Sequence, residues 1–146
     1  MKDGISVFTT GKVRGFVIFK QEKNYVKIYV RLMNVPEGKH GFHIHNKGDL
    51  RNGCKSLGGH YNPHKKQHGD IKDNNKHAGD LGNVKANKDK IVRTIIKTKQ
   101  FKVRDIIGRS VVIHSKPDDL GRGGNGESKK TGNAGKRIGC GIIGVL

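Results

Sequence analysis

Residues 25–32 read Tyr-Val-Lys-Ile-Tyr-Val-Arg-Leu, and this stretch decides the expected fold. Apolar residues alternate here with tyrosines and basic residues, so Val26, Ile28, Val30 and Leu32 would share one face. Alternation with a period of two residues is typical of a half-buried strand in an antiparallel sheet. The stretch therefore predicts a strand with one face on a core and the other in solvent.

Similar short β-branched runs recur along the chain, and Gly, Asn, Asp or Pro separates nearly all of them. They lie at about 4–9, 15–20, 40–45, 82–86, 91–98, 110–115 and 138–145. No stretch keeps the 3.6-residue period of an amphipathic helix. Eight strands without helices predict an all-β fold, an eight-stranded Greek-key β-barrel or sandwich of immunoglobulin-like architecture.

The length of 146 residues is that of one domain, so we expect a single domain over residues 1–146. Two polar, Gly-rich stretches interrupt the rhythm of strands, at about 46–81 and 116–137. Loops longer than about 12–15 residues are usually functional or disordered. Because strands flank both stretches, we expect two ordered loops that carry functional side chains.

The charge is strongly positive: 30 Lys and Arg stand against 12 Asp and Glu, a formal net charge of +18. Such a surplus fits a nucleic-acid binder, an enzyme that handles anions, or simply a basic surface. The longest basic runs are only pairs, no aromatic residues interleave with them, and eight histidines distinguish the chain from a simple polycation. Nucleic acid is therefore not the expected partner.

No apolar run approaches the about 20 residues of a membrane-spanning helix, so we expect no membrane partner. The first residues also lack the apolar stretch of a secretory signal. We expect the chain in the cytoplasm, either of its own cell or of a host cell.

The histidines suggest metal binding. In His43-Ile44-His45 a strand would place both imidazoles on one face and Ile44 on the other. Two imidazoles on one face suit a transition metal such as copper or zinc. Taken alone, however, each histidine is equally well explained as a surface residue or as a hydrogen-bonded core residue.

Further histidines lie in and after the first long loop. His60, His68, His77 and Asp80 supply three imidazoles and one carboxylate, which make a full tetrahedral shell for a structural Zn²⁺. His114 ends the apolar run Ser-Val-Val-Ile-His, where the second loop begins. Together these residues favour a metal site over a set of unrelated histidines.

At this point several motifs resemble one known family, the copper–zinc superoxide dismutases of the intracellular type. The motifs are Gly41-Phe-His-Ile-His45, Gly53-Cys54, Gly59-His60-Tyr-Asn-Pro63, His77-Ala-Gly-Asp-Leu-Gly-Asn83, Ile107-Gly-Arg-Ser-Val-Val-Ile-His114 and Gly132-Asn-Ala-Gly-Lys-Arg-Ile-Gly-Cys-Gly141. The matches run from about Gly38 to Leu146, whereas the first 35 residues match only in strand pattern and length.

The resemblance implies two metal sites that share one histidine. It implies one copper per subunit, cycling between Cu(II) and Cu(I), on His43, His45, His60 and His114. It implies one structural zinc, Zn(II), per subunit on His60, His68, His77 and Asp80. A deprotonated imidazole has two acceptor nitrogens, so His60 could bridge both metals. The implied reaction converts two superoxide anions and two protons to O₂ and H₂O₂, with a proton carried at His60.

The resemblance also implies roles around the metals. Arg137 would orient the anion, since a planar and permanently charged fork suits a small anion. Asp118 would hydrogen-bond a copper histidine and a zinc histidine together. The residues expected to line or steer the substrate channel are Thr131, Lys130, Lys129, Lys116 and Glu127. His40 and His64 match no ligand position.

The loop around this channel is more basic than is usual in the family. Residues 116–137 contain six basic residues against three acidic ones. Gly126 and Lys129 stand where relatives often have an acidic and a neutral residue. We therefore expect a more positive steering field than usual.

Cys54 and Cys140 are the only two cysteines. In a chain without a secretory signal, two thiols would ordinarily be interpreted as reduced. The resemblance instead implies an intrachain disulfide between the first loop and the last strand. It further implies a copper-delivery partner and a homodimer whose contact includes Gly48, Ile107, Gly108 and Val145.

Two other functions stay open beside the enzyme. A copper carrier or zinc-stabilised module could keep this fold without turnover, although all four implied copper ligands and Arg137 are present. A polyanion binder would rest on the net charge alone.

Overall fold

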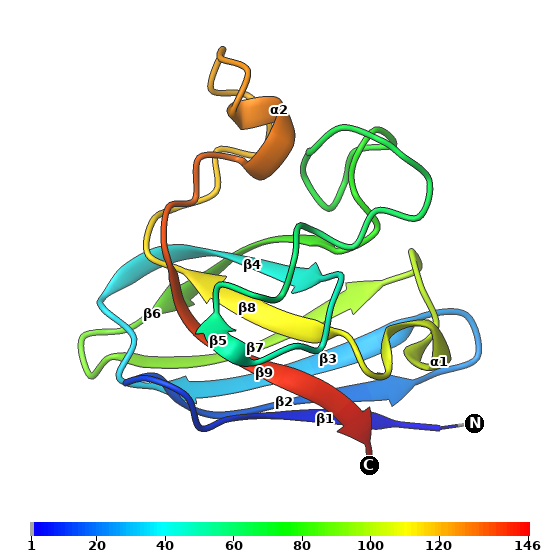
Figure 1. Ribbon diagram of the computed structural model, residues 1–146, viewed down its shortest axis with the longest axis vertical. Helices are drawn as coiled ribbons and strands as arrows, with labels where there is room; N and C mark the ends of the chain where they lie inside the picture. Colours follow the sequence, from blue (N-terminus) through cyan, green and yellow to red (C-terminus); the bar gives the residue numbers. More distant parts are fainter. Residues whose placement is uncertain (1) are drawn as a thin grey trace.

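The computed structural model describes residues 2–146, so Met1 of the expected domain lies outside the described residues. Its main feature is a closed antiparallel barrel with the strand order β1-β2-β3-β7-β6-β4-β8-β9 (Figure 1). The barrel strands are β1 (Gly4–Phe8), β2 (Arg14–Gln21), β3 (Val26–Met33), β4 (Gly38–His45), β6 (Asp80–Ala86), β7 (Ile91–Thr98), β8 (Ser110–His114) and β9 (Arg137–Val145). The predicted all-β, eight-stranded fold is confirmed.

β3 shows the predicted alternation. Val26, Ile28, Val30 and Leu32 are buried, whereas the residues between them are exposed or half-buried. β3 pairs along its whole length with β2 and β7, yet the chain continues to β4, which lies between β6 and β8. This step across the end of the barrel is the expected Greek-key connection.

The core fills the barrel and is mostly aliphatic, as the composition suggests. The largest fully buried side chains inside it include Phe8, Phe19, Phe42, Ile28 and Leu32. β1 and β9 pair with each other, so the first and last strands close the barrel. The described barrel therefore has no free strand edge around its circumference.

Three short elements contradict the prediction of eight strands without helices. A ninth strand, β5 (Arg51–Cys54), lies outside the barrel within the first long loop. The helices α1 (Val103–Ile106) and α2 (Ser128–Thr131) have four residues each. Elements of one turn or four residues are too short to produce a periodic pattern in the sequence, which is why they were not predicted.

Local polar contacts stabilise both helices. At α1, the Lys102 N–H donates to Asp105 Oδ2 at 2.9 Å. At α2, the Ser128 N–H donates to Asn125 Oδ1 at 2.8 Å, and Gly132 ends the helix with a left-handed φ of 74°. In the described part of the chain, neither helix has the length and apolar character needed to span a membrane.

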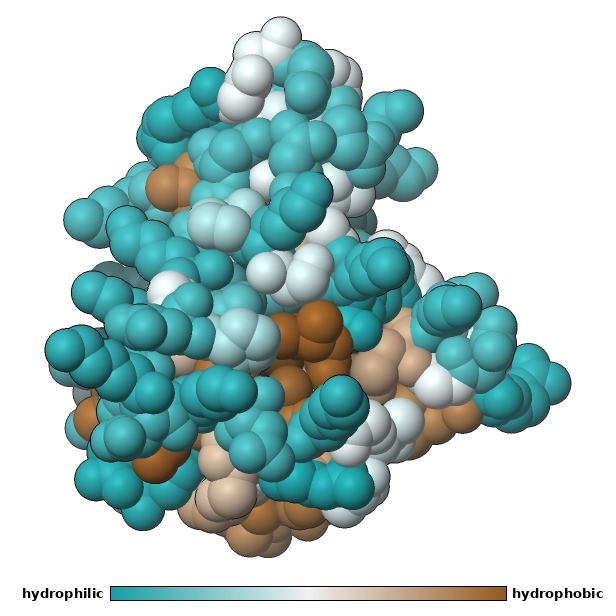
Figure 2. All heavy atoms as spheres, turned by 90° about the vertical axis from the view of Figure 1, so that its left-hand side faces the viewer, coloured by the Kyte–Doolittle hydropathy of each residue, from teal (hydrophilic) through white to brown (hydrophobic). Residues whose placement is uncertain are grey.

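The two long loops lie on the same side of the barrel, at the top of Figure 1. Figure 2 shows this upper part covered mostly by hydrophilic residues, whereas hydrophobic residues gather lower down, over the barrel. The first loop also contributes Leu57, Tyr61 and Ala78 to the buried apolar clusters, and polar contacts and cross-links hold the loops in addition.

One such cross-link is the disulfide between Cys54 in β5 and Cys140 in β9, with a Cα–Cα distance of 5.9 Å. The disulfide implied by the resemblance is confirmed, and the alternative of two reduced thiols is wrong for this structure. The bridge spans 86 residues of sequence and joins the first loop to the barrel.

We predict that the double substitution Cys54→Ser with Cys140→Ser lowers the free energy of unfolding by about 4.5 kcal/mol. This is the free energy that corresponds to the entropy the unfolded chain regains when a loop this long is no longer closed by the disulfide. The measurement is denaturant unfolding of oxidised protein. As the matched control, a reductant should destabilise the natural sequence to the level of the variant and leave the variant unchanged. Equal stability of the oxidised natural protein and the variant would contradict the prediction.

Candidate metal centre

The end of β4 is buried along both edges. β8 pairs with one edge, and on the other edge the Tyr61 N–H donates to the Ile44 carbonyl at 2.8 Å. An isolated bridge pairs His45 with His60 in the same loop segment. His43 and His45 are therefore almost completely buried, and His60 lies against both rings.

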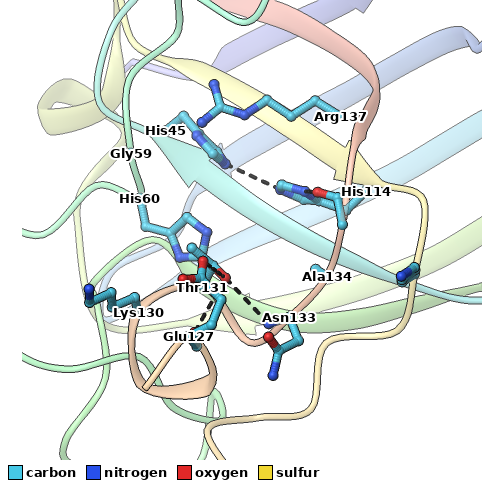
Figure 3. A pocket seen from close by; sticks show the side chains of 12 residues that line it. His45, Gly59, His60, His114, Glu127, Lys130, Thr131, Asn133, Ala134 and Arg137 are labelled. Atoms are coloured by element: carbon cyan, nitrogen blue, oxygen red, sulfur yellow. Dashed lines mark hydrogen bonds between the residues drawn. The ribbon is translucent and has the colours of Figure 1, made fainter. Parts of the chain in front are cut away.

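Two β-bulges lie beside the histidines. The β4–β6 register shifts between Gly41 and His43, and the β8–β9 register shifts between Ile113 and His114. A bulge bends its strand and redirects the side chains that follow it. The extra residues lie on β6 and β9, next to Asp80 and Arg137. Figure 3 shows that His114 from β8 faces His45 from β4, with 3.4 Å between the two Nε2 atoms.

Potential metal ligands form two groups that share members. In the first group, one ligand nitrogen from each ring lies within 4.8 Å of the others; its members are His43, His45, His60 and His114. The second group, by the same measure, is His43, His60, His68 and Asp80. His77 adjoins this second group, because its Nδ1 lies 3.1 Å from His60 Nδ1 and 3.2 Å from Asp80 Oδ1. The structure thus brings all the predicted ligand residues into one cluster.

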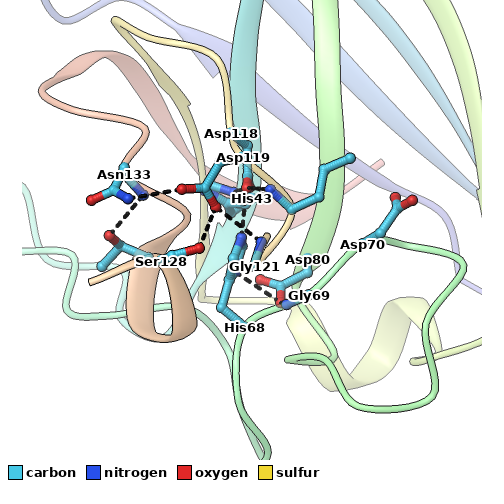
Figure 4. A network of polar contacts seen from close by, with 12 residues as sticks. His43, His68, Gly69, Asp70, Asp80, Asp118, Asp119, Gly121, Ser128 and Asn133 are labelled. Atoms are coloured by element: carbon cyan, nitrogen blue, oxygen red, sulfur yellow. Dashed lines mark hydrogen bonds and ion pairs between the residues drawn. The ribbon is translucent and has the colours of Figure 1, made fainter. Parts of the chain in front are cut away.

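The carboxylate of Asp118 connects the two groups (Figure 4). It accepts a hydrogen bond from His43 Nε2 at 2.6 Å and another from His68 Nε2 at 2.7 Å. Its own backbone is held by Asn83, which donates to the Asp118 carbonyl at 3.0 Å and accepts from its N–H at 2.6 Å. Gly132 must lack a side chain here, because a Cβ would lie 2.0 Å from Asp118 Oδ1.

These bonds fix which nitrogen of each ring is available to a metal. His43 and His68 both donate their Nε2–H to Asp118, and the Nδ1 of each is buried without a hydrogen-bond partner. His68 Nδ1 lies 3.0 Å from Asp80 Oδ2, yet without the geometry of a hydrogen bond. Buried polar atoms without partners are rare in proteins. Each of these two atoms is therefore left free to bind a cation.

The rings of His45 and His114 follow the same pattern. His45 Nδ1 donates to the Gly58 carbonyl at 2.9 Å, and His114 Nδ1 donates to the Gly135 carbonyl at 3.1 Å. A neutral imidazole has one donor nitrogen, so each Nε2 keeps a lone pair. Two lone pairs that face each other at 3.4 Å fit a shared metal ion. The donor set therefore fits copper on this side, where nitrogen ligands dominate.

The pKa values favour this arrangement. Burial lowers the pKa of His43 and of His45 well below 6.5, and the neighbouring His60 lowers both further. Burial also lowers the pKa of His60, and it lowers that of His114 to about 4. These four rings are neutral at pH 7, so a metal does not compete with protons for their lone pairs.

The second group has a different charge balance. Burial would raise the pKa of Asp80, but the contacts with the rings of His60, His68 and His77 outweigh it and hold the pKa well below 3.8. Burial would lower the pKa of His68, but Asp118 and Asp80 raise it to about 9. His68 thus carries a proton in the metal-free protein at pH 7, and a metal must displace it. Three imidazoles and one carboxylate fit zinc.

Arg137 lies beside the first group. Its two terminal nitrogens donate to the carbonyls of Cys54, at 2.9 Å, and Gly58, at 2.7 Å. Burial lowers its pKa from 12.5, and the guanidinium remains charged at pH 7. Because Gly58 also accepts from His45, one carbonyl positions both side chains. Two of the five guanidinium N–H groups are used, and the others remain for an anion.

A hollow of about 400 Å³ lies beside His45, His60 and His114. Its wall includes Arg137, Lys116 and Lys130, and Thr131 Oγ1 donates to Glu127 Oε1 at 2.8 Å on the rim (Figure 3). Four of the predicted channel residues thus line the hollow: Lys116, Glu127, Lys130 and Thr131. The structure instead places Lys129 on a neighbouring hollow beside His77, with Lys66.

Apart from Asp118, sequence analysis did not identify the residues that support the ligands. Asn83 lies within a quoted motif, yet no spacing rule points to its bonds with Asp118. Asp119, Ser128 and Asn133 form a further network behind Asp118 (Figure 4). The carbonyls of Gly58 and Gly135 cannot be predicted from residue type. As expected, His40 stays outside both groups: its ring bonds the His114 and Pro36 carbonyls, and His64 is exposed.

Comparison with known proteins agrees with this geometry. The family described as "Copper/zinc superoxide dismutase (SODC)" matches residues 13–143. "Superoxide dismutase [Cu-Zn] 5" of Dictyostelium discoideum is 50% identical over 146 residues, covering 95% of each chain. "Extracellular superoxide dismutase [Cu-Zn]" of Caenorhabditis elegans is 50% identical over 135 residues, 90% of this chain and 61% of that protein.

A solved structure extends the similarity to the whole fold. The crystal structure of the clock protein EA4 superimposes with a TM-score of 0.95 at 42% identity, covering 99% of this chain and 94% of that one. The family match spans most of the barrel and both long loops. The chain belongs to the copper–zinc superoxide dismutase family, oxidoreductases that act on superoxide and use copper and zinc.

Proposed function

We propose that this chain is one domain that dismutates superoxide at the centre described above, with roles for its residues as follows. Copper is held by His43, His45, His60 and His114. The observation that supports this assignment is the position of His45 Nε2 and His114 Nε2, which lie 3.4 Å apart and each keep a lone pair. The Nδ1 atom of each ring is bonded to a backbone carbonyl instead.

Zinc is held by His60, His68, His77 and Asp80. The support is the convergence of His60 Nδ1, His77 Nδ1 and Asp80 Oδ1 within 3.0–3.2 Å, together with the partnerless Nδ1 of His68. With its Nδ1 on the zinc side, His60 has Nε2 left for the copper side. Its ring could therefore hold both metals, one at each nitrogen.

Bound copper would supply one-electron chemistry in both directions, so that one superoxide leaves as O₂ and the next, with two protons, leaves as H₂O₂. Arg137 binds the anion through its unused N–H groups and orients it in the hollow. Its bonds to Cys54 and Gly58 hold the guanidinium in place. His60 Nε2 holds a proton between the two half-reactions and donates it to the reduced product.

The loop residues steer the anion. Lys116 and Lys130 line the hollow directly, and Lys129 adds charge from the adjacent hollow. Glu127 accepts from Thr131 and so fixes the rim beside these cations. Charges around a funnel raise the rate of encounter with an anion, and nearby charges act more strongly than distant ones.

We propose a homodimer that forms through the face where β1 meets β9. Val7, Ile142 and Val145 are 52%, 38% and 57% exposed, and all three lie on these two paired strands. Gly48 and Gly108 lie at the border of this face, where a Cβ on Gly48 would lie 2.0 Å from the Gly108 carbonyl oxygen. Ile107 is half-buried beside them. An apolar face of this kind fits a second copy of the chain.

The cytoplasmic location and a copper-delivery partner stay predictions of the sequence. One of the similar proteins carries the name "Extracellular superoxide dismutase [Cu-Zn]". Fractionation of the source cells with an antibody to the protein tests the location directly.

We predict that His114→Ala removes copper but keeps zinc, and that it lowers superoxide turnover by more than about a hundredfold. The reason is that even changing a partner of a metal ligand typically costs about 10–100-fold. Metal analysis and turnover are measured on one sample. His64→Ala is the matched control, and its copper content and turnover should not change. A copper-replete wild type without turnover would favour a carrier instead.

We predict that Lys130→Glu lowers the second-order rate constant for superoxide about three- to tenfold at low ionic strength, and that it flattens the salt dependence. The measurement is turnover by pulse radiolysis across a salt series. Lys27→Glu on β3 makes the same change in net charge away from the hollow and should have little effect. Equal effects of the two substitutions would show that steering comes from the diffuse charge of +18.

We predict that Val145→Lys weakens dimerisation at least about tenfold, because a two-fold interface would contain the new charge twice. Sedimentation velocity over a concentration series measures the equilibrium. The matched control is Ile95→Lys on β7, where the original side chain is 52% exposed. A dimer unaffected by Val145→Lys, or a monomeric wild type, would contradict the proposed interface.

A further inference from the structure

The outer face of β2, β3 and β7 has an ordered arrangement of charge that the dismutase reaction does not use. These three strands carry six basic residues and no acidic residue: Arg14, Lys20, Lys27, Arg31, Arg93 and Lys97. In Figure 1, β2 and β3 lie in the lower half of the barrel, away from the two long loops. We call this surface the basic face.

Strand register arranges the basic face in rows that run across the strands. Lys27 lies directly opposite Lys20 on one side and Lys97 on the other, and Arg31 lies opposite Arg93. Neighbouring strands are about 4.8 Å apart, and four residues along a strand span about 13 Å. A row of three lysines and a pair of arginines thus lie about 13 Å apart on one surface.

Between these rows lies an apolar and aromatic row. Tyr29 is paired with Ile18 on β2 and with Ile95 on β7, and Phe16 lies opposite Arg31. Phe16 is 36% exposed and Ile95 is 52% exposed. These side chains and that of Arg93 line a hollow of about 640 Å³; its lining includes Phe16, Ile18, Tyr29, Arg31, Arg93 and Ile95. Small-ligand sites have volumes of about 300–1,000 Å³.

The charge of the basic face is not neutralised by the protein itself. Within residues 2–146, the arginines that form ion pairs with carboxylates are Arg51 and Arg122, and both lie elsewhere. Lys27 instead lies over the Tyr29 ring, with Nζ 5.3 Å from the ring centroid. Like charges directly opposite each other destabilise a sheet. An anionic ligand would relieve that repulsion.

We propose that the basic face binds a single-stranded nucleic acid. Proteins that bind single strands combine basic side chains that follow the phosphates with aromatic side chains on which bases stack. Here the lysine row and the arginine pair flank Tyr29, and Phe16 lies beside Arg31 at the end of the arginine pair. Each strand alone shows only part of this pattern, and the register of three strands assembles it.

Two other occupants fit less well. A second copy of the chain would bring two rows of positive charge against each other. An anionic membrane would bind an apolar surface that projects beyond its basic border. On this face, the apolar row lines a hollow together with Arg31 and Arg93.

The test measures fluorescence anisotropy of labelled oligo-dT and oligo-U, each of about 12 nucleotides, with the metal-loaded protein across a salt series. The double variant Arg31→Gln with Arg93→Gln should bind both probes at least about tenfold more weakly at low salt. The slope of log affinity against log salt should fall by about 1.4, the value for two lost phosphate contacts on a single strand. Preference between the probes distinguishes DNA from RNA.

The matched control is the double variant Lys39→Gln with Lys85→Gln. These two lysines are exposed and lie directly opposite each other on β4 and β6, so the change in net charge is identical. The control should bind as tightly as the natural sequence. Superoxide turnover should be unchanged in both double variants, because neither pair lies in the metal centre.

A third variant, Tyr29→Leu, tests stacking. It should weaken binding about tenfold without changing the salt slope, because it removes a ring and no charge. Three results would overturn the proposal: no binding to either probe, equal losses in the two double variants, or binding to phosphatidylserine vesicles that exceeds binding to the oligonucleotides.

Discussion

The two hydrogen bonds that Asp118 accepts determine most of the chemistry of this protein. One carboxylate fixes the tautomer of His43 on a barrel strand and of His68 on a loop, and both rings then present Nδ1 inward. Asp118 itself lies on the second loop, where Asn83 of β6 holds its backbone. Segments far apart in sequence, around His43, His68 and Asn83, therefore converge on one residue. Orientation of the ligands and order of both loops depend on the same interaction.

The molecule separates stability from chemistry in space. The barrel carries the buried apolar core, whereas the loops above it are polar and are held by hydrogen bonds, the disulfide and the metal ligands. The loops bury fewer apolar side chains than the barrel, so ligand binding supplies much of their order. The arrangement also keeps the basic loop residues around the hollow, where their charge acts on an incoming anion.

Sequence reasoning predicted the fold from patterns that extend over several residues. The alternation of residues 25–32 became β3, and the His43-Ile44-His45 motif became two buried imidazoles. Features that depend on a single residue or on register were not predictable. β5 and both helices are too short for a period, and Asn83 supports Asp118 through contacts between β6 and the second loop. The basic face could not be predicted without the register of three strands, because the sequence alone does not show that Tyr29 lies opposite Ile95.

Closure of the barrel through β1 and β9 has a consequence for biosynthesis. Most contacts in such a topology join residues distant in sequence, and folding dominated by non-local contacts is slow. β9 is the last barrel strand to leave the ribosome, and it carries both Arg137 and Cys140. The nascent chain therefore has no closed barrel, disulfide or anion-binding arginine until synthesis reaches β9. The metal centre therefore cannot carry out redox chemistry until all the barrel strands have been synthesised.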